Sequence, residues 1–296
     1  MWILAKTDLG SSIPFISDLA VHAKVHLKGV MSKFTELLAL LGGGAICFAF
    51  GLYDDKYGTS PTVKFSVEII SILILIFVGV KLDIFVSVPF LGAFITVFWV
   101  VFITNAFNLL DNMDGLSAGV AAIALLFFTI VNYQLGQIFL VCIMAALMGS
   151  ILGFLPYNIN PSRIFMGDAG SLFLGFTIGS LTVISTFYDA TSPTPLSIMK
   201  PLVIFAVPAF DTLSVMYIRL SRGLPIFQGD KNHFSHRLVS IGMSHRNAVN
   251  FIYLVTLCTG ISATLLRYLP IYGGIVILAQ VVIIFAIIVL LERIRQ

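Results

Sequence analysis

The stretch NAFNLLDNMDGL, residues 105–116, carries three polar side chains at the end of a long apolar segment. Asn108, Asp111 and Asp114 are spaced three residues apart, so a helix would place them on one face. A carboxylate at membrane depth is costly and usually faces an ion, a partner or a water-filled cavity. The pattern therefore indicates a functional site where a membrane helix ends. The alternative is a hydrated helix end closed by a turn at Gly115.

Composition predicts that the whole chain is a membrane protein. Its 296 residues are 58% hydrophobic and only 10% charged, whereas soluble domains carry about 25% charged residues. Apolar stretches of about 20 residues, the length that crosses a bilayer, recur with little sequence between them. We therefore expect a single all-α domain, a polytopic bundle of about nine transmembrane helices. The spans are expected near residues 36–53, 63–80, 89–107, 116–133, 137–156, 171–188, 199–219, 248–268 and 270–292.

The distribution of basic residues predicts how these spans are oriented. Because spans alternate in direction, four polar loops fall on one side: residues 54–62, 108–115, 157–170 and 220–247. Most lysine and arginine residues near the span ends lie on that side as well, and the positive-inside rule makes it cytoplasmic. Residues 1–35 are then an extracytoplasmic segment and residues 36–296 form the transmembrane bundle.

The polar loops carry two groups of acids besides the opening stretch. Asp54 and Asp55 are adjacent and are followed by Lys56, and paired carboxylates can hold a divalent cation or share a proton. Asp168 lies between glycine and small residues before the next span, where backbone N–H groups favour phosphate. A carboxylate placed there would meet a phosphate through a metal ion. A solvated loop and a simple turn are the respective alternatives.

The fourth loop is basic and rich in histidine, with the sequence GDKNHFSHRL at residues 229–238. His233, His236 and Arg237 would share one side of a helix. Phosphate suits this group better than zinc, because the neighbouring lysine and arginine repel a cation. Attachment to anionic lipid headgroups is the alternative. Asp211, inside the preceding span, fits a structural and a catalytic role equally well.

Acids on three loops and a basic, histidine-bearing fourth loop predict one site at one membrane face. A divalent cation, Mg²⁺ with Mn²⁺ as the alternative, would bridge the carboxylates to a phosphate-rich ligand. Cys47, Cys142 and Cys258 lie inside apolar segments without metal-ligand spacing and are expected to be small buried hydrophobic residues. The formal charge of +3 does not imply a nucleic-acid partner.

Four motifs, taken in order, resemble the cytoplasmic-loop motifs of the polyprenyl-phosphate N-acetylhexosamine-1-phosphate transferases. They read DDKYG at 54–58, NAFNLLDNMDGLSAG at 105–119, NINPSRIFMGDAGSL at 158–172 and DKNHFSHRL at 230–238. The resemblance implies that Asp54, Asp55, Asn108 and Asp111 are catalytic, with one acid of the 54/55 pair as a base, and that Asp168 and Asp55 hold the metal. It further implies that the substrates are bound by Asp114, Asn158, Lys56, Asp230, His233, His236 and Arg237.

The same resemblance implies the reaction and its setting. A UDP-N-acetylhexosamine, of the N-acetylglucosamine type, would give its sugar 1-phosphate to polyprenyl (undecaprenyl) phosphate and release UMP at the cytoplasmic face of the bacterial inner membrane. This would be the first membrane step of cell-envelope polysaccharide synthesis. The sequence does not set the oligomeric state, and a homodimer is one alternative. Two departures stand out: relatives place a histidine where Ser235 stands, and the chain is expected to lack the family's first two spans.

Two other functions remain open at this point. An ion-coupled transporter would also carry membrane aspartates, but it would place them at mid-span in two related halves of the chain. The acids here gather at one face, and no internal repeat is visible. An inactive family member that still binds its ligands is the second alternative.

Overall fold

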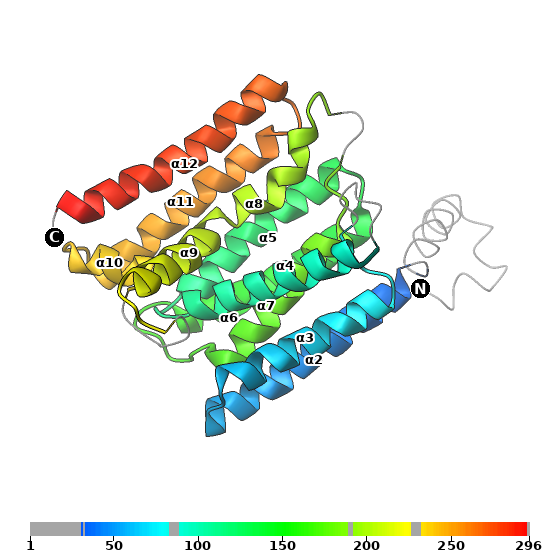
Figure 1. Cartoon of the computed structure of the whole chain (residues 1–296), viewed down its shortest axis with the longest axis horizontal. Helices are drawn as coiled ribbons and strands as arrows, with labels where there is room; N and C mark the ends of the chain where they lie inside the picture. Colours follow the sequence, from blue (N-terminus) through cyan, green and yellow to red (C-terminus); the bar gives the residue numbers. More distant parts are fainter. Residues whose placement is uncertain (1–30, 32, 83–88, 189–191, 226–231, 295–296) are drawn as a thin grey trace, which may run out of the picture.

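The computed structural model describes residues 31, 33–82, 89–188, 192–225 and 232–294, and all regular structure within them is helical. The long helices lie side by side in one bundle, as Figure 1 shows. In chain order they are α2 (Phe34–Tyr57), α3 (Pro61–Phe77), α4 (Pro89–Leu110), α5 (Leu116–Gln134), α6 (Ile138–Asn158), α7 (Gly167–Ile184), the 3₁₀ helix η3 (Pro195–Met199), α8 (Lys200–Ile204), α9 (Ala206–Ser221), α10 (Phe234–Ser240), α11 (His245–Leu265) and α12 (Ile271–Ile294). The predicted all-α membrane bundle is confirmed.

The predicted number of spans is not confirmed. Seven of the described helices are long and apolar enough to cross a membrane, and an eighth span results if the bent segment from η3 to α9 is counted as one. Helix α3, at the second predicted span, has 17 residues and is not among these seven. Each predicted span does coincide with helical structure to within several residues. The predicted extracytoplasmic segment, residues 1–35, lies almost entirely outside the described residues.

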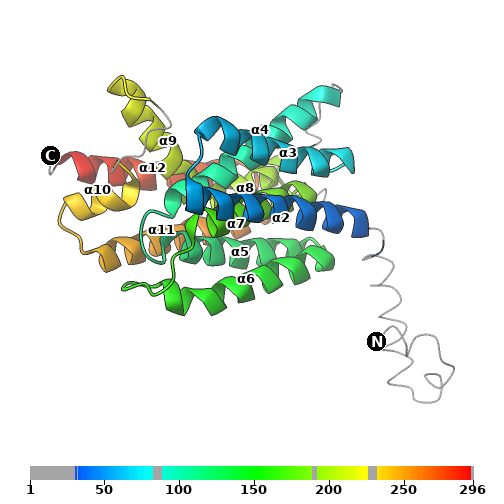
Figure 2. The ribbon, with the colours of Figure 1, turned by 90° about the horizontal axis from the view of Figure 1, so that it is seen from below.

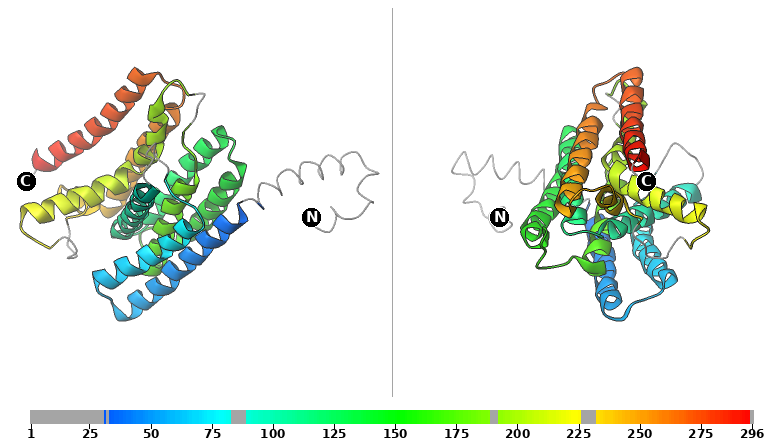
Figure 3. Two further views of the ribbon diagram at one scale, coloured as in Figure 1. Left: turned by 45° about the vertical axis from the view of Figure 1, so that its right-hand side comes forward. Right: turned by 90° about the vertical axis from the view of Figure 1, so that its left-hand side faces the viewer.

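The centre of the bundle consists of α5 and α7, the two most buried spans. Helix α7 packs between α2 and α4, and small residues let these backbones approach closely, as is common between membrane helices. A Cβ atom on Gly175 of α7 would lie 2.7 Å from the Cα atom of Thr104 in α4. Figure 3 shows α12 along the side of the bundle opposite α2 and α3.

The chain is broken between α8 and α9, where the two helices meet at an angle of 67°. Pro208 lies in the first turn of α9 and has no N–H to give to the carbonyl group of Ile204, which favours the break. Phe205 at the break is fully buried, with its ring 4.9 Å from that of Phe128. Helix α9 consequently turns away from the rest of the bundle (Figure 2).

Several predicted loop boundaries are wrong, because the neighbouring helices extend further than expected. Helix α2 continues to Tyr57 and ends at Gly58, whose φ of 66° suits glycine, so Asp54 and Asp55 belong to its last turns. Helix α7 begins at Gly167, so Asp168 lies in its first turn instead of in a loop before it. These helix ends, together with α10, gather at the lower left of Figure 1. We call this the Asp54 end of the bundle.

Candidate active site

Two carboxylates from different helices meet around one ammonium group at the Asp54 end. Nζ of Lys64, in the first turns of α3, lies 2.6 Å from Oδ2 of Asp168 and 3.4 Å from Oδ2 of Asp54. Asn108, in the last turn of α4, accepts a hydrogen bond from Lys64 at 3.3 Å and donates one to Oδ1 of Asp168 at 2.7 Å. Three predicted site residues, from α2, α4 and α7, are therefore brought together around a lysine.

Asp55 is held by the start of α7. Its Oδ1 accepts a hydrogen bond from the backbone N–H of Asp168 at 2.7 Å, and its Oδ2 accepts one from Ala169 at 3.1 Å. The first N–H groups of a helix have no partner within the helix and carry a partial positive charge, so a carboxylate is stable there. Asp54 differs, because its Oδ1 is buried without a hydrogen-bond partner among the described residues.

Two glycines allow α2 and α7 to come this close. A Cβ atom on Gly51 of α2 would lie 2.4 Å from the Cα atom of Ala169 in α7. Gly167 has a φ of 63°, and a Cβ atom there would lie 2.7 Å from Oδ2 of Asp55. A side chain at either position would force the acids of α2 away from the start of α7.

Asp111 and Asp114, in the turn between α4 and α5, have opposite surroundings. Burial raises the pKa of Asp111 to about 7, with a further contribution from the charges of neighbouring carboxylates, chiefly those of Asp168 and Asp55. Although burial acts in the same direction on Asp114, hydrogen bonds from Ser162 hold the pKa of Asp114 below its usual value. Oγ of Ser162 donates to Oδ1 of Asp114 at 2.9 Å. Negative charge is therefore crowded at Asp111 and compensated at Asp114.

Replacement of Asp111 by asparagine should stabilise the protein while it abolishes transfer. A folded-state pKa of about 7, above the usual 3.8, means that the folded state loses stability as the pH rises through this interval. In a chelating buffer, Asp111→Asn should melt at a higher temperature than the unmodified protein at pH 8, and the difference should shrink toward pH 5. A melting difference that grows toward low pH would contradict the crowding of charge at Asp111.

Asn158 connects two loops of the site. Its Oδ1 accepts a hydrogen bond from Gly115 N at 3.1 Å, and its Nδ2 donates to Ile164 O at 2.9 Å. The side chain is buried, so in this structure it holds the loops and presents no free group to a ligand. Tyr253 of α11 supports the same turn, because its hydroxyl donates to Gly115 O at 2.5 Å.

The histidine loop is fixed by a buried aspartate of α9. Asp211 accepts a hydrogen bond from the backbone N–H of Phe234 at 2.5 Å, at the start of α10, and its other oxygen lies 3.0 Å from Nδ1 of His233. A carboxylate in this position fixes the orientation of the imidazole ring and favours a proton on Nδ1. Asp211 therefore acts on the site by positioning His233.

His236 and Arg237 point to different surroundings although they are neighbours on α10. His236 borders two cavities of the structure. Arg237 is buried, and its Nε donates to Glu292 of α12 at 3.0 Å. Ser235, at the predicted departure from the family pattern, donates to Oδ1 of Asn112 at 2.5 Å and so joins α10 to the acidic turn.

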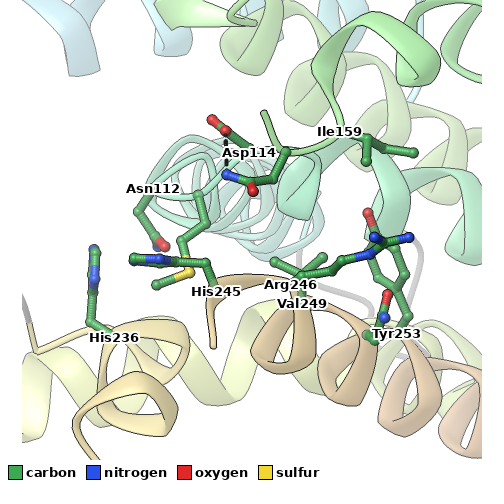
Figure 4. Close-up of a pocket in the computed structure, with 11 residues that line it drawn as sticks. Asn112, Asp114, Ile159, His236, His245, Arg246, Val249 and Tyr253 are labelled. Atoms are coloured by element: carbon green, nitrogen blue, oxygen red, sulfur yellow. Dashed lines mark hydrogen bonds between the residues drawn. The ribbon is translucent and has the colours of Figure 1, made fainter. Parts of the chain in front are cut away.

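A cavity of about 310 Å³ lies beside this turn, and Figure 4 shows the side chains around it. Asn112 and Asp114 border it on one side, and His236, His245 and Arg246 border it on the other. Asp114 is joined across its rim to Asn160, which donates at 3.0 Å. The cavity therefore offers amide and carboxylate groups on one wall and imidazole and guanidinium groups on the opposite wall.

The sequence of this chain matches a known protein family. Residues 37–186, which include the helices that carry Asp54, Lys64, Asn108 and Asp168, match the family described as glycosyl transferase family 4. The chain belongs to glycosyl transferase family 4.

Similar proteins from the family carry related names. A probable undecaprenyl-phosphate N-acetylglucosaminyl 1-phosphate transferase of Bacillus subtilis (strain 168) is 37% identical over 279 residues, which cover 91% of this chain and 76% of that protein. A decaprenyl-phosphate N-acetylglucosaminephosphotransferase of Mycolicibacterium smegmatis is 31% identical, over 74% of this chain and 61% of that protein. An undecaprenyl-phosphate alpha-N-acetylglucosaminyl 1-phosphate transferase of Escherichia coli (strain K12) is 28% identical, over 86% of this chain and 71% of that protein.

The donor set of this family 4 chain fits a hard divalent cation that shares its ligands with a substrate. Within the described residues, no three His, Cys, Asp or Glu side chains are arranged to hold a metal ion by themselves. Mg²⁺ is usually bound by one or two carboxylates together with phosphate oxygens and water. Oδ2 of Asp54 and Oδ2 of Asp168 supply two carboxylate oxygens beside Lys64, and Asn108 adds an amide oxygen beside them.

The remaining predicted site residues of this family 4 chain lie apart from the acids or outside the described part. Lys56 is exposed, with its ammonium group 5.0 Å from the centre of the Tyr57 ring. Asp230, and Lys231 next to it, lie outside the described residues.

Sequence reasoning missed two basic residues of the site. Lys64 was not among the predicted site residues, although a lone lysine in an apolar helix was the signal that could have identified it. Arg246 borders the cavity from α11 and has no local sequence signal that separates it from other basic residues.

Proposed function

We propose that this protein transfers N-acetylglucosamine 1-phosphate from UDP-N-acetylglucosamine to a polyprenyl phosphate carrier and releases UMP. One observation carries the proposal: in a family 4 chain, Asp54, Asn108 and Asp168 converge on Lys64 where membrane helices end. The names of its relatives support the sugar and the lipid acceptor. The positive-inside distribution of lysine and arginine supports a site on the cytoplasmic face of the bacterial inner membrane.

Phosphate groups of both substrates would meet at Lys64. An oxygen of the lipid phosphate forms a bond to the sugar-linked phosphorus of the UDP-sugar, and the bond from that phosphorus to the oxygen of the departing UMP breaks. Asp54 is the better-placed base of the acidic pair, because one of its oxygens is free of hydrogen bonds while both oxygens of Asp55 are engaged by α7. Asp54 would take the proton of a lipid phosphate that arrives protonated.

The proposed reaction would use a divalent metal ion bound among the carboxylates. Asp54, Asn108 and Asp168 would hold Mg²⁺, with Mn²⁺ as the alternative, and the bound ion would neutralise negative charge on the pyrophosphate of the donor. Asp55 would act on this set indirectly, since it fixes the start of α7 and thereby the position of Asp168. Lys64 would compensate the charge of the two carboxylates and pair with phosphate oxygens when they enter.

The cavity beside the acidic turn is the best candidate for the nucleotide. Asn112 and Asp114 offer hydrogen-bonding partners to a uracil base, and Arg246 and His245 can pair with a phosphate group. A volume of about 310 Å³ is within the usual range of small-molecule sites, which begins at about 300 Å³.

Replacement of Arg246 by glutamine should raise the KM for the UDP-sugar about tenfold and leave kcat nearly unchanged, because a lost charge-assisted hydrogen bond weakens substrate and transition state alike. The measurement is a steady-state titration of the UDP-sugar at saturating lipid phosphate. Arg163→Gln, which removes an exposed arginine that does not border this cavity, is the control. A fall in kcat with unchanged KM would place the nucleotide elsewhere.

The proposed reaction as a whole is tested by isotope exchange. Membranes containing the protein, a polyprenyl phosphate and Mg²⁺ should exchange labelled UMP into UDP-N-acetylglucosamine, because one phosphoanhydride replaces another and the reaction is reversible. Chelation of divalent cations should stop the exchange, and other UDP-N-acetylhexosamines should exchange more slowly. Binding of the UDP-sugar without any exchange would support an inactive family member instead.

A further inference from the structure

A second cavity, of about 360 Å³, opens between the C-terminal ends of α9 and α12. It is bordered by Ser214 and Tyr217 of α9, by Arg222 directly after α9, and by Glu292 and Arg293 of α12. The two helices meet deeper in the bundle, where the rings of Phe210 and Phe285 stack with their centres 4.4 Å apart. Figure 2 shows α9 turning away from α12.

The charged groups of this cavity favour an anion at its rim. The charge of Arg237 is compensated by Glu292, since their side chains are joined at 3.0 Å in a buried pair. Arg222 and Arg293 are both exposed, and the hydrogen bond from Arg222 to Asn232 is long, at 3.4 Å. Guanidinium groups match phosphate oxygens in geometry and are weakly hydrated, so two exposed arginines at one rim suit a phosphate group.

Besides a phosphate group, the ligand of this cavity should carry a hydrogen-bond donor for Glu292. Its Oε2 accepts from Arg237, whereas its Oε1 is buried and has no hydrogen-bond partner among the described residues. Buried carboxylate oxygens are nearly always paired, and Glu292 borders the cavity, so this unpaired oxygen suits a hydrogen-bond donor of a ligand. The ligand should therefore combine a phosphate with an O–H or N–H group a short distance away.

The position of the cavity favours a lipid as the source of this phosphate. Helices α9 and α12 both end here, and the chain beyond each carries arginine, as at a membrane surface. The same two helices expose apolar side chains, Leu213 and Leu220 on α9 and Ile287 and Leu290 on α12. These apolar side chains can contact acyl chains while the headgroup remains between the helix ends.

We propose that this cavity binds a bilayer phospholipid of the phosphatidylglycerol type. The phosphodiester pairs with Arg222 and Arg293, and a hydroxyl group of the glycerol headgroup donates to Oε1 of Glu292. Because α10 separates this site from the acidic turn and His236 borders both cavities, the bound lipid would also support the histidine loop. Polyprenyl phosphate has no donor group apart from its phosphate, and phosphatidylcholine lacks any donor, so neither meets both requirements.

Native mass spectrometry of the detergent-solubilised full chain tests this assignment with lipids of matched acyl chains. Phosphatidylglycerol should be retained about tenfold more tightly than phosphatidylmethanol, which has the same charge but no free hydroxyl, because a hydrogen bond to a charged group is lost. Phosphatidylcholine should be retained more weakly still. Equal retention of the three lipids would overturn the proposal.

Variants test whether the lipid binds in this cavity or is held by any exposed arginine of the protein. The double replacement Arg222→Gln/Arg293→Gln should weaken phosphatidylglycerol retention about tenfold or more. Arg163→Gln, which removes an exposed arginine that borders neither cavity, should leave retention unchanged. Both variants alter exposed side chains, and size-exclusion chromatography in detergent checks that they fold.

A loss of retention in Arg163→Gln equal to that in the double variant would overturn the proposal. Displacement of phosphatidylglycerol by polyprenyl phosphate or by UMP would assign the cavity to a substrate and overturn it as well.

Discussion

Replacement of Asp54 by asparagine is expected to lower metal-dependent exchange of UMP into the UDP-sugar about 10³-fold, within the range usual for the loss of a general base. The substitution keeps the shape of the side chain but removes a proton acceptor and a ligand for a cation. It also leaves Lys64 with one carboxylate partner fewer, at the position where Asp54 now lies 3.4 Å away. The rate of exchange at saturating substrates measures the effect.

Two further variants show whether the loss belongs to Asp54 itself. Glu36→Gln changes an acid in the first turn of the same helix, where its partner is Lys33, and should leave exchange unchanged. Asp55→Asn should lower both exchange and melting temperature, because the new amide group can accept only one of the two hydrogen bonds from the start of α7. Retention of more than about a tenth of the rate in Asp54→Asn would rule out Asp54 as the base.

The sequence predicted that the acids would share one face, because that follows from counting spans. Each loop between alternate spans returns to the same side, so Asp54, Asn108 and Asp168 had to meet there if the helices formed one bundle. The sequence did not predict which atoms would face each other. That depends on the rotation of α2, α4 and α7 about their axes, which is set by close contacts such as Gly175 against Thr104.

Helix ends were predicted less well than helices. Charged residues were taken as loop residues, yet α2 continues through Asp54 and Asp55, since a helix end can hold charges until a residue such as Gly58 stops it. The broken span at α8 and α9 was expected as one continuous helix. Pro208 was visible in the sequence, but tertiary packing of Phe205 decides whether a proline kinks a helix or ends it.

Local sequence patterns could not predict the ion pairs that join distant parts of the chain. Arg237 belongs to a motif with two histidines, and spacing alone grouped it with them as a substrate ligand. In the structure its guanidinium group pairs with Glu292, 55 residues further along the chain, and stacks near Phe210 of α9. Only the arrangement of α9, α10 and α12 in space creates that partner, and no periodicity in the sequence records it.

Replacement of Lys64 by methionine is expected to lower the rate of exchange by about 10²–10³-fold. Removal of one preorganised group that stabilises charge in a transition state usually has an effect of this size. Lys64 is the cation that Asp54 and Asp168 share in this structure. Without it, two carboxylates face each other with a site for a cation between them. The half-saturating Mg²⁺ concentration should therefore fall while the maximal rate falls as well, because like charges in contact bind a divalent cation more readily.

A lower maximal rate together with tighter Mg²⁺ binding would show that Lys64 balances charge in the site and does not act on folding alone. Loss of structure would lower the rate without strengthening metal binding, and circular dichroism and melting in detergent would reveal it. Lys33→Met removes a lysine whose partner is Glu36, before the start of α2, and should alter neither quantity. Lys64→Arg should restore part of the rate, since it keeps the charge but spreads it over a planar group that fits the two carboxylates differently. A Lys64→Met variant with an unchanged rate would show that the substrates and metal ion complete the site without the lysine.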